Sequence, residues 1–340
     1  MQGFIQVPDC YIFVAELHWP MNTSFIFENL ISPPILFFFL GLLARWIKSD
    51  LEFPPAISKF LSLYLLFAIG LKGGTELAHS GLSSEVLLAL GLAMILAIIV
   101  PFYSFYLLRT KFDIYNAGAL AATYGSISAV TFVTAVAFLQ AMNQEYGGFM
   151  VAAMALMESP ALIIGVILIR FYDTNNKNGN LGEVVKEAFT NASVVLILGA
   201  LIIGALVSPA QMKSIEPFTK ELFTGILTFF LLDMGLLAGK RINGLRQAGW
   251  MVIVFGILAP LFNAAMALVL GIMGNLSAGN VFLLMVLGAS ASYIAVPAAL
   301  RMAVPQANAG IYVSMSLAVT FPFNIVLGIP IYYYLVMQMN

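Results

Sequence analysis

Long apolar runs separated by short polar breaks cover most of the chain from residue 31 to its end. Because a helix needs about 20 apolar residues to cross the hydrocarbon core of a bilayer, each run is a candidate membrane span. Ten such runs lie at residues 31–47, 55–71, 86–108, 114–139, 147–171, 192–207, 222–237, 250–273, 281–300 and 311–337. The pattern predicts an all-α integral membrane protein with ten transmembrane helices.

The composition agrees with a protein that lies in a bilayer. Of the 340 residues, 61% are hydrophobic and 9% are charged, whereas an ordinary soluble domain is about 25% charged. A formal net charge of −1 provides no basic surface for nucleic acid. The single cysteine, Cys10, and two distant histidines, His18 and His79, offer no cluster for metal or nucleophilic catalysis. We therefore expect no enzyme activity, no cofactor and no nucleic-acid partner.

Lysine and arginine are distributed unequally between the segments that connect the spans. With ten spans, alternate connections share a side of the membrane. One side then holds twelve basic residues, and the other holds only Lys72, Lys213 and Lys220. Since basic residues accumulate on the cytoplasmic side, both termini are predicted on the non-cytoplasmic side of the plasma (inner) membrane.

Two polar segments lie outside the spans. Residues 1–30 are predicted to be an N-terminal extension or tail, of which residues 1–20 read either as an upstream extension or as a short interfacial helix. The Asn- and Gly-rich stretch at 173–187 is predicted to be a cytoplasmic linker. It divides the chain into halves of five spans each, residues 31–172 and 188–340.

The two halves share the order of their helix-breaking residues. Four pairs match at separations between 159 and 165 positions: Gly70 with Gly235, Pro101 with Pro260, Gly125 with Gly288, and Pro160 with Pro322. A repeat with an odd number of spans must lie in the membrane in opposite senses. This inverted repeat is the plan of many secondary transporters, whose sites lie at paired, interrupted helices.

Spans four and nine are such a pair, because each has small polar residues where a membrane helix is usually most apolar. Span four carries the run 125–128 and span nine the run 288–292, followed by Pro297. A broken helix presents free N–H groups and the positive end of its dipole to an anion. The hydroxyls of Ser126, Ser128, Thr131, Ser290 and Ser292, with unwound carbonyls, suit Na⁺. The alternative is that these small residues only let helices pack closely.

Two acids interrupt apolar spans, where a charge costs at least ~2.5 kcal/mol. Glu158 precedes Ser159 and Pro160, where we expect a helix irregularity, and it is a candidate Na⁺ ligand or proton acceptor. Its alternative is a structural acid. Asp233 is more simply an acid at a helix end that pairs with Lys240 or Arg241. Arg301 either guards the cytoplasmic mouth or anchors span nine at the interface.

Segments from both halves resemble the sodium-dependent bicarbonate transporter family known from cyanobacteria. They are GLKGG at 70–74, YGSISAVT at 124–131, PAL at 160–162, and ASASYIAVPAALRMAVPQANAGIY at 289–312, with Ser316, Pro322 and Pro330. Several positions differ from the family pattern, among them Ala129 and Val130 in span four, where small or hydroxyl residues are expected. Tyr293 replaces an acid, and Glu158 replaces an aspartate.

The resemblance implies a gate domain of spans one, two, six and seven and a core domain of spans three to five and eight to ten. It also implies elevator-like movement of the core, a homotrimer and a cytoplasmic PII-like regulator. Substrate and Na⁺ would bind where spans four and nine cross.

We therefore predict a Na⁺-coupled symporter of a small anion, most simply bicarbonate. The alternatives are a carrier of another small organic anion, or a proton-coupled carrier. The candidate substrate-binding residues are Gly125, Ser126, Ser128, Ala129, Ser290, Ala291 and Ser292. The candidate Na⁺ ligands are Ser128, Thr131, Glu158 and Ser292.

Overall fold

The computed structural model describes residues 31–81, 83–173 and 192–339, together with positions 182, 186 and 190. Of these described residues, 83% are helical, and none lies in a strand. The predicted N-terminal tail and most of the predicted linker lie outside them.

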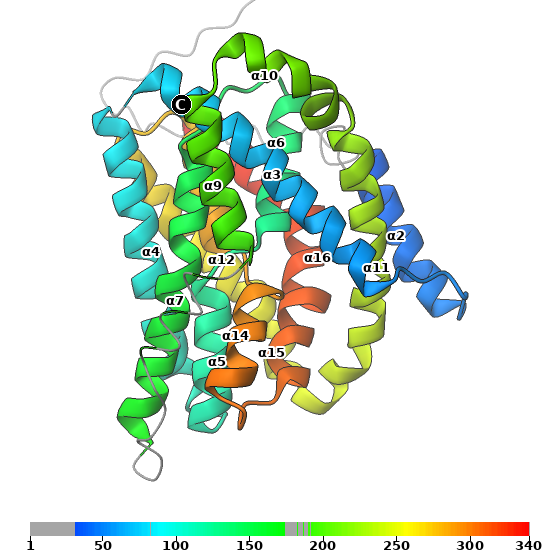
Figure 1. Ribbon diagram of the computed structural model, residues 1–340. Helices are drawn as coiled ribbons and strands as arrows, with labels where there is room; N and C mark the ends of the chain where they lie inside the picture. Colours follow the sequence, from blue (N-terminus) through cyan, green and yellow to red (C-terminus); the bar gives the residue numbers. More distant parts are fainter. Residues whose placement is uncertain are drawn as a thin grey trace, which may run out of the picture.

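The helices follow one another closely along the chain (Figure 1). They are α2 (Pro33–Trp46), α3 (Pro55–Ser80), α4 (Ser84–Leu108), α5 (Ile114–Gly125), α6 (Ala129–Ala141), α7 (Met150–Tyr172), α9 (Ala192–Leu206), α10 (Pro209–Glu216), α11 (Phe223–Ala248), α12 (Trp250–Met273), α13 (Ala278–Ala289), α14 (Ala295–Ala303), α15 (Ala309–Met315), α16 (Phe321–Phe323) and α17 (Ile329–Met339). Three π-helical turns lie at Pro217–Glu221, Ser316–Thr320 and Asn324–Gly328.

Seven helical stretches in the described part of the chain are long and apolar enough to cross a membrane. Three shorter apolar helices, α2, α9 and α13, accompany them. An all-helical fold with this many apolar helices is that of a multi-pass integral membrane protein. Many exposed side chains are large and apolar, such as Ile98, Phe102 and Phe262, as a surface against lipid requires.

Local signals in the sequence set where several helices begin. Pro33 and Pro55 open α2 and α3, at positions where a missing backbone N–H costs nothing. The Ser83 hydroxyl accepts a hydrogen bond from the Val86 N–H at the start of α4. The Asp113 carboxylate accepts from two backbone N–H groups and caps α5.

Of the two proline pairs that match between the halves, only Pro160 and Pro322 have different surroundings. Pro101, Pro160 and Pro260 lie within continuous helices. The irregularity that we expected at Glu158–Pro160 is therefore wrong, because α7 continues as one helix through its proline. Around Pro322 the chain instead forms two π-helical turns on either side of the short α16.

Two helix pairs, α2 with α11 and α3 with α9, pack so closely that their backbones are in contact at glycines. Gly41 lies against the Leu232 carbonyl, and Gly235 lies against the Phe38 carbonyl. In the other pair, Gly74 lies against the Leu201 carbonyl and Gly204 against that of Leu71. A side chain at any of the four would collide with a neighbouring backbone, so close packing fixes these residues as glycine.

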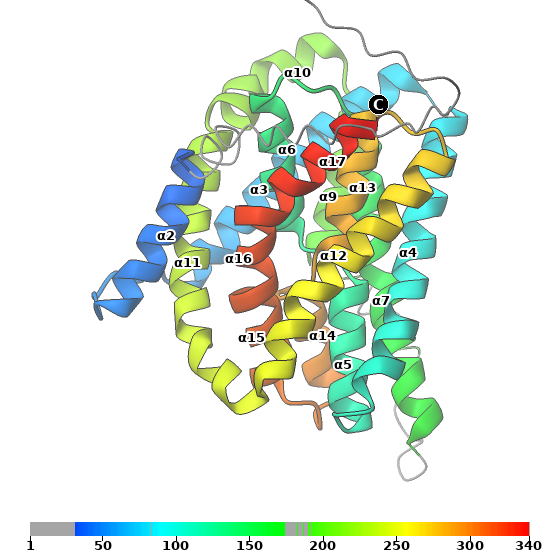
Figure 2. The ribbon, with the colours of Figure 1, turned by 180° about the vertical axis from the view of Figure 1, so that it is seen from behind.

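Apart from α10, the remaining helices, α4–α7 and α12–α17, surround the two helix breaks (Figure 2). In the most apolar part of the stretch that contains α5 and α6, 89% of the residues are buried. The corresponding share is 44% in α4 and in α12. The first break is thus enclosed by protein, where irregular backbone can be tolerated at membrane depth.

Candidate functional site

The helices break at both serine-rich runs, as the sequence predicts. Residues 126–128 separate α5 from α6, and residues 290–294 separate α13 from α14. The two breaks are in contact: the Ser128 N–H donates to Ser290 Oγ at 3.0 Å. The Ser292 N–H donates to the Thr123 carbonyl at 2.9 Å. These bonds join the two halves of the chain at their most irregular backbone.

Each break starts a helix whose first N–H groups lack an intrahelical acceptor. Ser128 Oγ accepts from the Thr131 N–H at 3.2 Å, which caps α6. Ser292 Oγ accepts from the Val296 N–H at 3.3 Å, near the start of α14. The first N–H groups of α6, from Ala129 and Val130, carry the positive end of its dipole, and Ala295 provides the first N–H of α14.

A small cavity of about 30 Å³ lies at these two helix starts. A single water needs ~10–15 Å³ by the same measure, so the cavity has room for an ion or a very small molecule. Its walls come from α3, both breaks, α7 and the start of α9: Ser62, Leu66, Ile127, Ser128, Ala129, Val130, Glu158, Ser193, Ser292, Tyr293, Ile294 and Ala295.

Glu158 places a carboxylate in the wall of this cavity. Its side chain is only 9% exposed, and the ion pairs found among the described residues do not include it. Its backbone carbonyl accepts a hydrogen bond from Ser126 Oγ at 3.4 Å. An acid in this position can balance a cation beside the positive ends of two helices.

The cavity brings together some of the predicted site residues and leaves out others. Ser128, Ala129, Glu158 and Ser292 line it, whereas Gly125, Ser126, Thr131, Ser290 and Ala291 do not. Gly125 packs against Pro101, and Ser290 supports the Ser128 backbone. Thr131 Oγ1 is buried and has no hydrogen-bond partner in the described structure.

Several wall residues were not predicted as site residues. Ser62 and Ser193 come from α3 and from the start of α9. Isolated serines in apolar helices carry no sequence signal, and only the packing of α3 and α9 against the breaks brings them here. Tyr293 is 8% exposed and packs edge-to-face on Phe321, with ring centroids 5.4 Å apart.

A larger cavity of about 620 Å³ adjoins the small one and shares Ser62, Ser193 and Tyr293 with it. Three basic side chains, Lys59, Arg241 and Arg301, also line this larger cavity. We call it the basic vestibule. The C-terminal part of α14, which carries Arg301, forms part of its wall. Arg301 is exposed and lines the basic vestibule rather than the small cavity.

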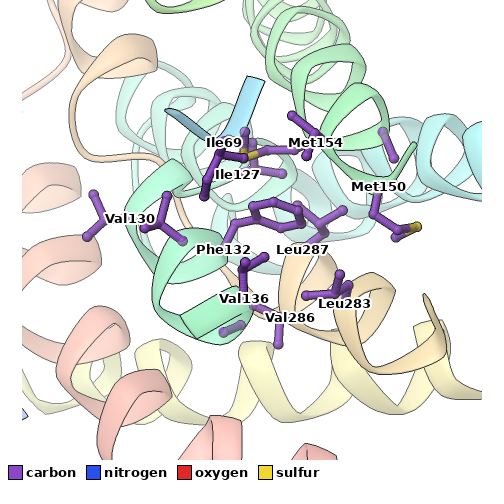
Figure 3. Packing of buried hydrophobic residues seen from close by; sticks show 14 of the residues in the cluster. Ile69, Ile127, Val130, Phe132, Val136, Met150, Met154, Leu283, Val286 and Leu287 are labelled. Carbon is purple, nitrogen blue, oxygen red and sulfur yellow. The ribbon is translucent and has the colours of Figure 1, made fainter. Parts of the chain in front are cut away.

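On the opposite side, α6 separates the site from a third cavity. Ala129 at the start of α6 lines the small cavity, and Gln140 near its end lines a cavity of about 590 Å³. The two cavities come closest along α3, where Leu66 lines the small cavity and Ala68 lines the third one, but they share no wall residue. Packed apolar side chains, among them Phe132, Val136 and Leu283, surround α6 between its two ends (Figure 3).

Asp233 lies outside the site. It is 3% exposed, and its Oδ2 has no hydrogen-bond partner in the described structure. Lys240 pairs with Glu52 instead. The expected helix-end position of Asp233 is wrong, because α11 continues to Ala248. Asp233 lines a cavity of about 570 Å³ together with Ser58, which also lines the basic vestibule.

Paired helix breaks that enclose a small polar cavity in an all-helical membrane fold are typical of secondary transporters. Comparison with protein families gives the same class. The model of the Na⁺-dependent bicarbonate transporter superfamily matches residues 33–337, so the chain belongs to this superfamily. The superfamily consists of transporters and not of enzymes. A search of curated proteins found no significant match.

Proposed function

We propose that the protein is a Na⁺-coupled symporter of a small anion, with bicarbonate as the first candidate. The observation that carries the proposal is the cavity at which the starts of α6 and α14 meet a buried carboxylate. Family membership supports Na⁺ as the coupling ion and bicarbonate as the anion.

The chemistry of the cavity favours an anion together with a cation. The N–H groups of Ala129 and Val130, with that of Ala295, form the part of the wall that suits an anion. Glu158 and the hydroxyls of Ser128 and Ser292 provide the oxygen ligands that a hard cation prefers. We propose that Na⁺ binds beside Glu158, neutralises it, and lets the anion dock on the helix starts.

We propose ten spans, made of the seven long apolar stretches and the three shorter helices, in two inverted repeats. Repeated contacts support this arrangement. Gly204 lies 163 positions after Gly41, and Leu232 lies 161 positions after Leu71. The contact of Gly41 with Leu232 is therefore equivalent to the contact of Gly204 with Leu71. The contact of Gly235 with Phe38 is likewise equivalent to that of Gly74 with Leu201. This register pairs Gly235 with Gly74 rather than with Gly70.

A second pair of equivalent contacts involves side-chain amides. Asn116 Oδ1 accepts from the Asn308 N–H at 2.8 Å, before α15. Asn280 Oδ1 accepts from the Gly147 N–H at 2.7 Å, before α7. A shift of 161–164 positions relates the two bonds, and such agreement far from the glycine contacts supports a repeat of the whole half.

We propose alternating access in which α2, α3, α9 and α11 form a gate and the other spans form a moving core. The basic vestibule shares several wall residues with the site, whereas the opposite cavity shares none. With the basic end in the cytoplasm, the structure corresponds to an inward-facing state. Four further statements stay predictions: the location in the plasma membrane, the position of both termini outside the cytoplasm, the homotrimer and the PII-like regulator.

Uptake of labelled bicarbonate into proteoliposomes at alkaline pH tests the function. We expect an inward Na⁺ gradient to accelerate uptake, with K⁺ in place of Na⁺ as the control. Uptake driven by a pH gradient without Na⁺ would select proton coupling through Glu158. Competition by unlabelled organic acids, with no effect of bicarbonate, would select another anion. Absence of saturable uptake with every anion and gradient would overturn the proposal.

A further inference from the structure

We propose that Ser62, together with Ser193, completes the binding site only while it faces the cytoplasm. These gate-helix hydroxyls then set the affinity for the anion at the inner face and leave the outer-face affinity unchanged. The inference rests on the proposed function, and it assigns to two gate residues a role in substrate affinity.

Among the described residues of the gate helices, only these two serines place a hydroxyl side chain in the walls of both cavities. Each lines both the small cavity and the basic vestibule. They therefore lie where an anion leaves the helix starts and enters the vestibule. Ser58, about one turn earlier on α3, lines the vestibule but not the small cavity.

The gate side and the core side of the cavity contribute different atoms. The core side provides the N–H groups of the helix starts and the serines that cap them, all within the two breaks. These groups travel with the core and meet the anion in both states. Ser62 belongs to α3, which packs on α9 through Gly74 and Gly204. Because α3 and α9 stay in place as the core moves, Ser62 meets the anion in one state alone.

The repeat gives a reason why the outer face lacks an equivalent hydroxyl. The shift of 161 positions that relates Gly74 to Gly235 also relates Ser62 to Phe223. Phe223 is a wall residue of the cavity on the opposite side. In the outward-facing state, the gate position equivalent to Ser62 thus presents an aromatic ring and no hydrogen-bond donor. The two faces of the carrier should differ in their affinity for the anion.

Transport by membrane vesicles of both orientations separates the two faces. Right-side-out vesicles report the KM for bicarbonate at the outer face, and everted vesicles report it at the inner face. We expect Ser62→Ala and Ser193→Ala each to raise the inner-face KM by about two- to tenfold, the loss of one hydrogen bond. The outer-face KM should stay at the wild-type value. Ser62→Thr, which keeps the hydroxyl, should restore the inner-face KM.

Ser58→Ala is the matched control, since it removes a hydroxyl from α3 outside the small cavity, and both KM values should stay unchanged. Equal changes at both faces for Ser62→Ala would overturn the inference, as would no change at either face. Loss of saturable uptake by the wild type in both kinds of vesicle would instead overturn the proposed function. The two failures are therefore distinguishable.

Discussion

Replacing Glu158 with glutamine removes one negative charge from the wall of the site and changes its size very little. Two unit charges about 4 Å apart attract each other by about 4 kcal/mol at an effective dielectric constant of 20. Each 1.4 kcal/mol is a tenfold change in affinity. Glu158 is buried, so water screens this attraction weakly. We expect Glu158→Gln to raise the KM for Na⁺ by roughly 100- to 1,000-fold.

The assay is uptake of labelled bicarbonate by proteoliposomes over a wide range of external Na⁺ concentrations. Asp233→Asn is the matched control, because it removes the other acid from an apolar span but lies outside the small cavity. We expect that control to keep the wild-type Na⁺ dependence. An unchanged KM for Na⁺ in Glu158→Gln would refute the reasoning, and so would an equal loss in Asp233→Asn.

Three further predictions concern the crossing and the packing around it. Ser128→Leu and Ser292→Leu should each reduce uptake to background while the protein still inserts, since a branched apolar chain fills the small cavity; uptake by both variants would mean that the site is misplaced. Gly74→Val should destabilise the protein by about 1–3 kcal/mol, seen as a lower Tm in detergent, whereas Gly91→Val, which meets open space, should keep the Tm. Asn280→Ala leaves a backbone N–H without its acceptor and should cost about 1–3 kcal/mol by the same measurement; an unchanged Tm would remove this contact from the account.

The sequence predicts the helical class of the fold well, because apolar runs and breaks are local signals. The expected run 86–108 is close to α4, and the serine-rich runs coincide with both helix breaks. Pro160 is different. The sequence marks a helix breaker, but neighbouring helices decide whether the helix breaks, and α7 continues. The end of α11 was likewise missed, since the helix continues for several turns past its apolar part.

The candidate site was predicted in part. Serines in the two breaks could be recognised because they interrupt apolar runs at matching positions. The sequence could not separate Ser128, which lines the cavity, from Ser126, which does not line it and bonds to a backbone carbonyl. The side on which each serine falls depends on the dihedral angles of three irregular residues. Ser62 and Ser193 reach the site only through tertiary packing, which no local pattern encodes.

Coupling between the two ions at one site is the central claim, and the flux of ²²Na⁺ tests it most directly. Coupling is reciprocal. If transport of the anion depends on Na⁺, a gradient of the anion must in turn drive transport of Na⁺. In proteoliposomes with equal Na⁺ on both sides, an inward bicarbonate gradient should drive ²²Na⁺ accumulation, and Ser128→Leu should abolish it. A ²²Na⁺ flux that ignores the bicarbonate gradient would contradict the account.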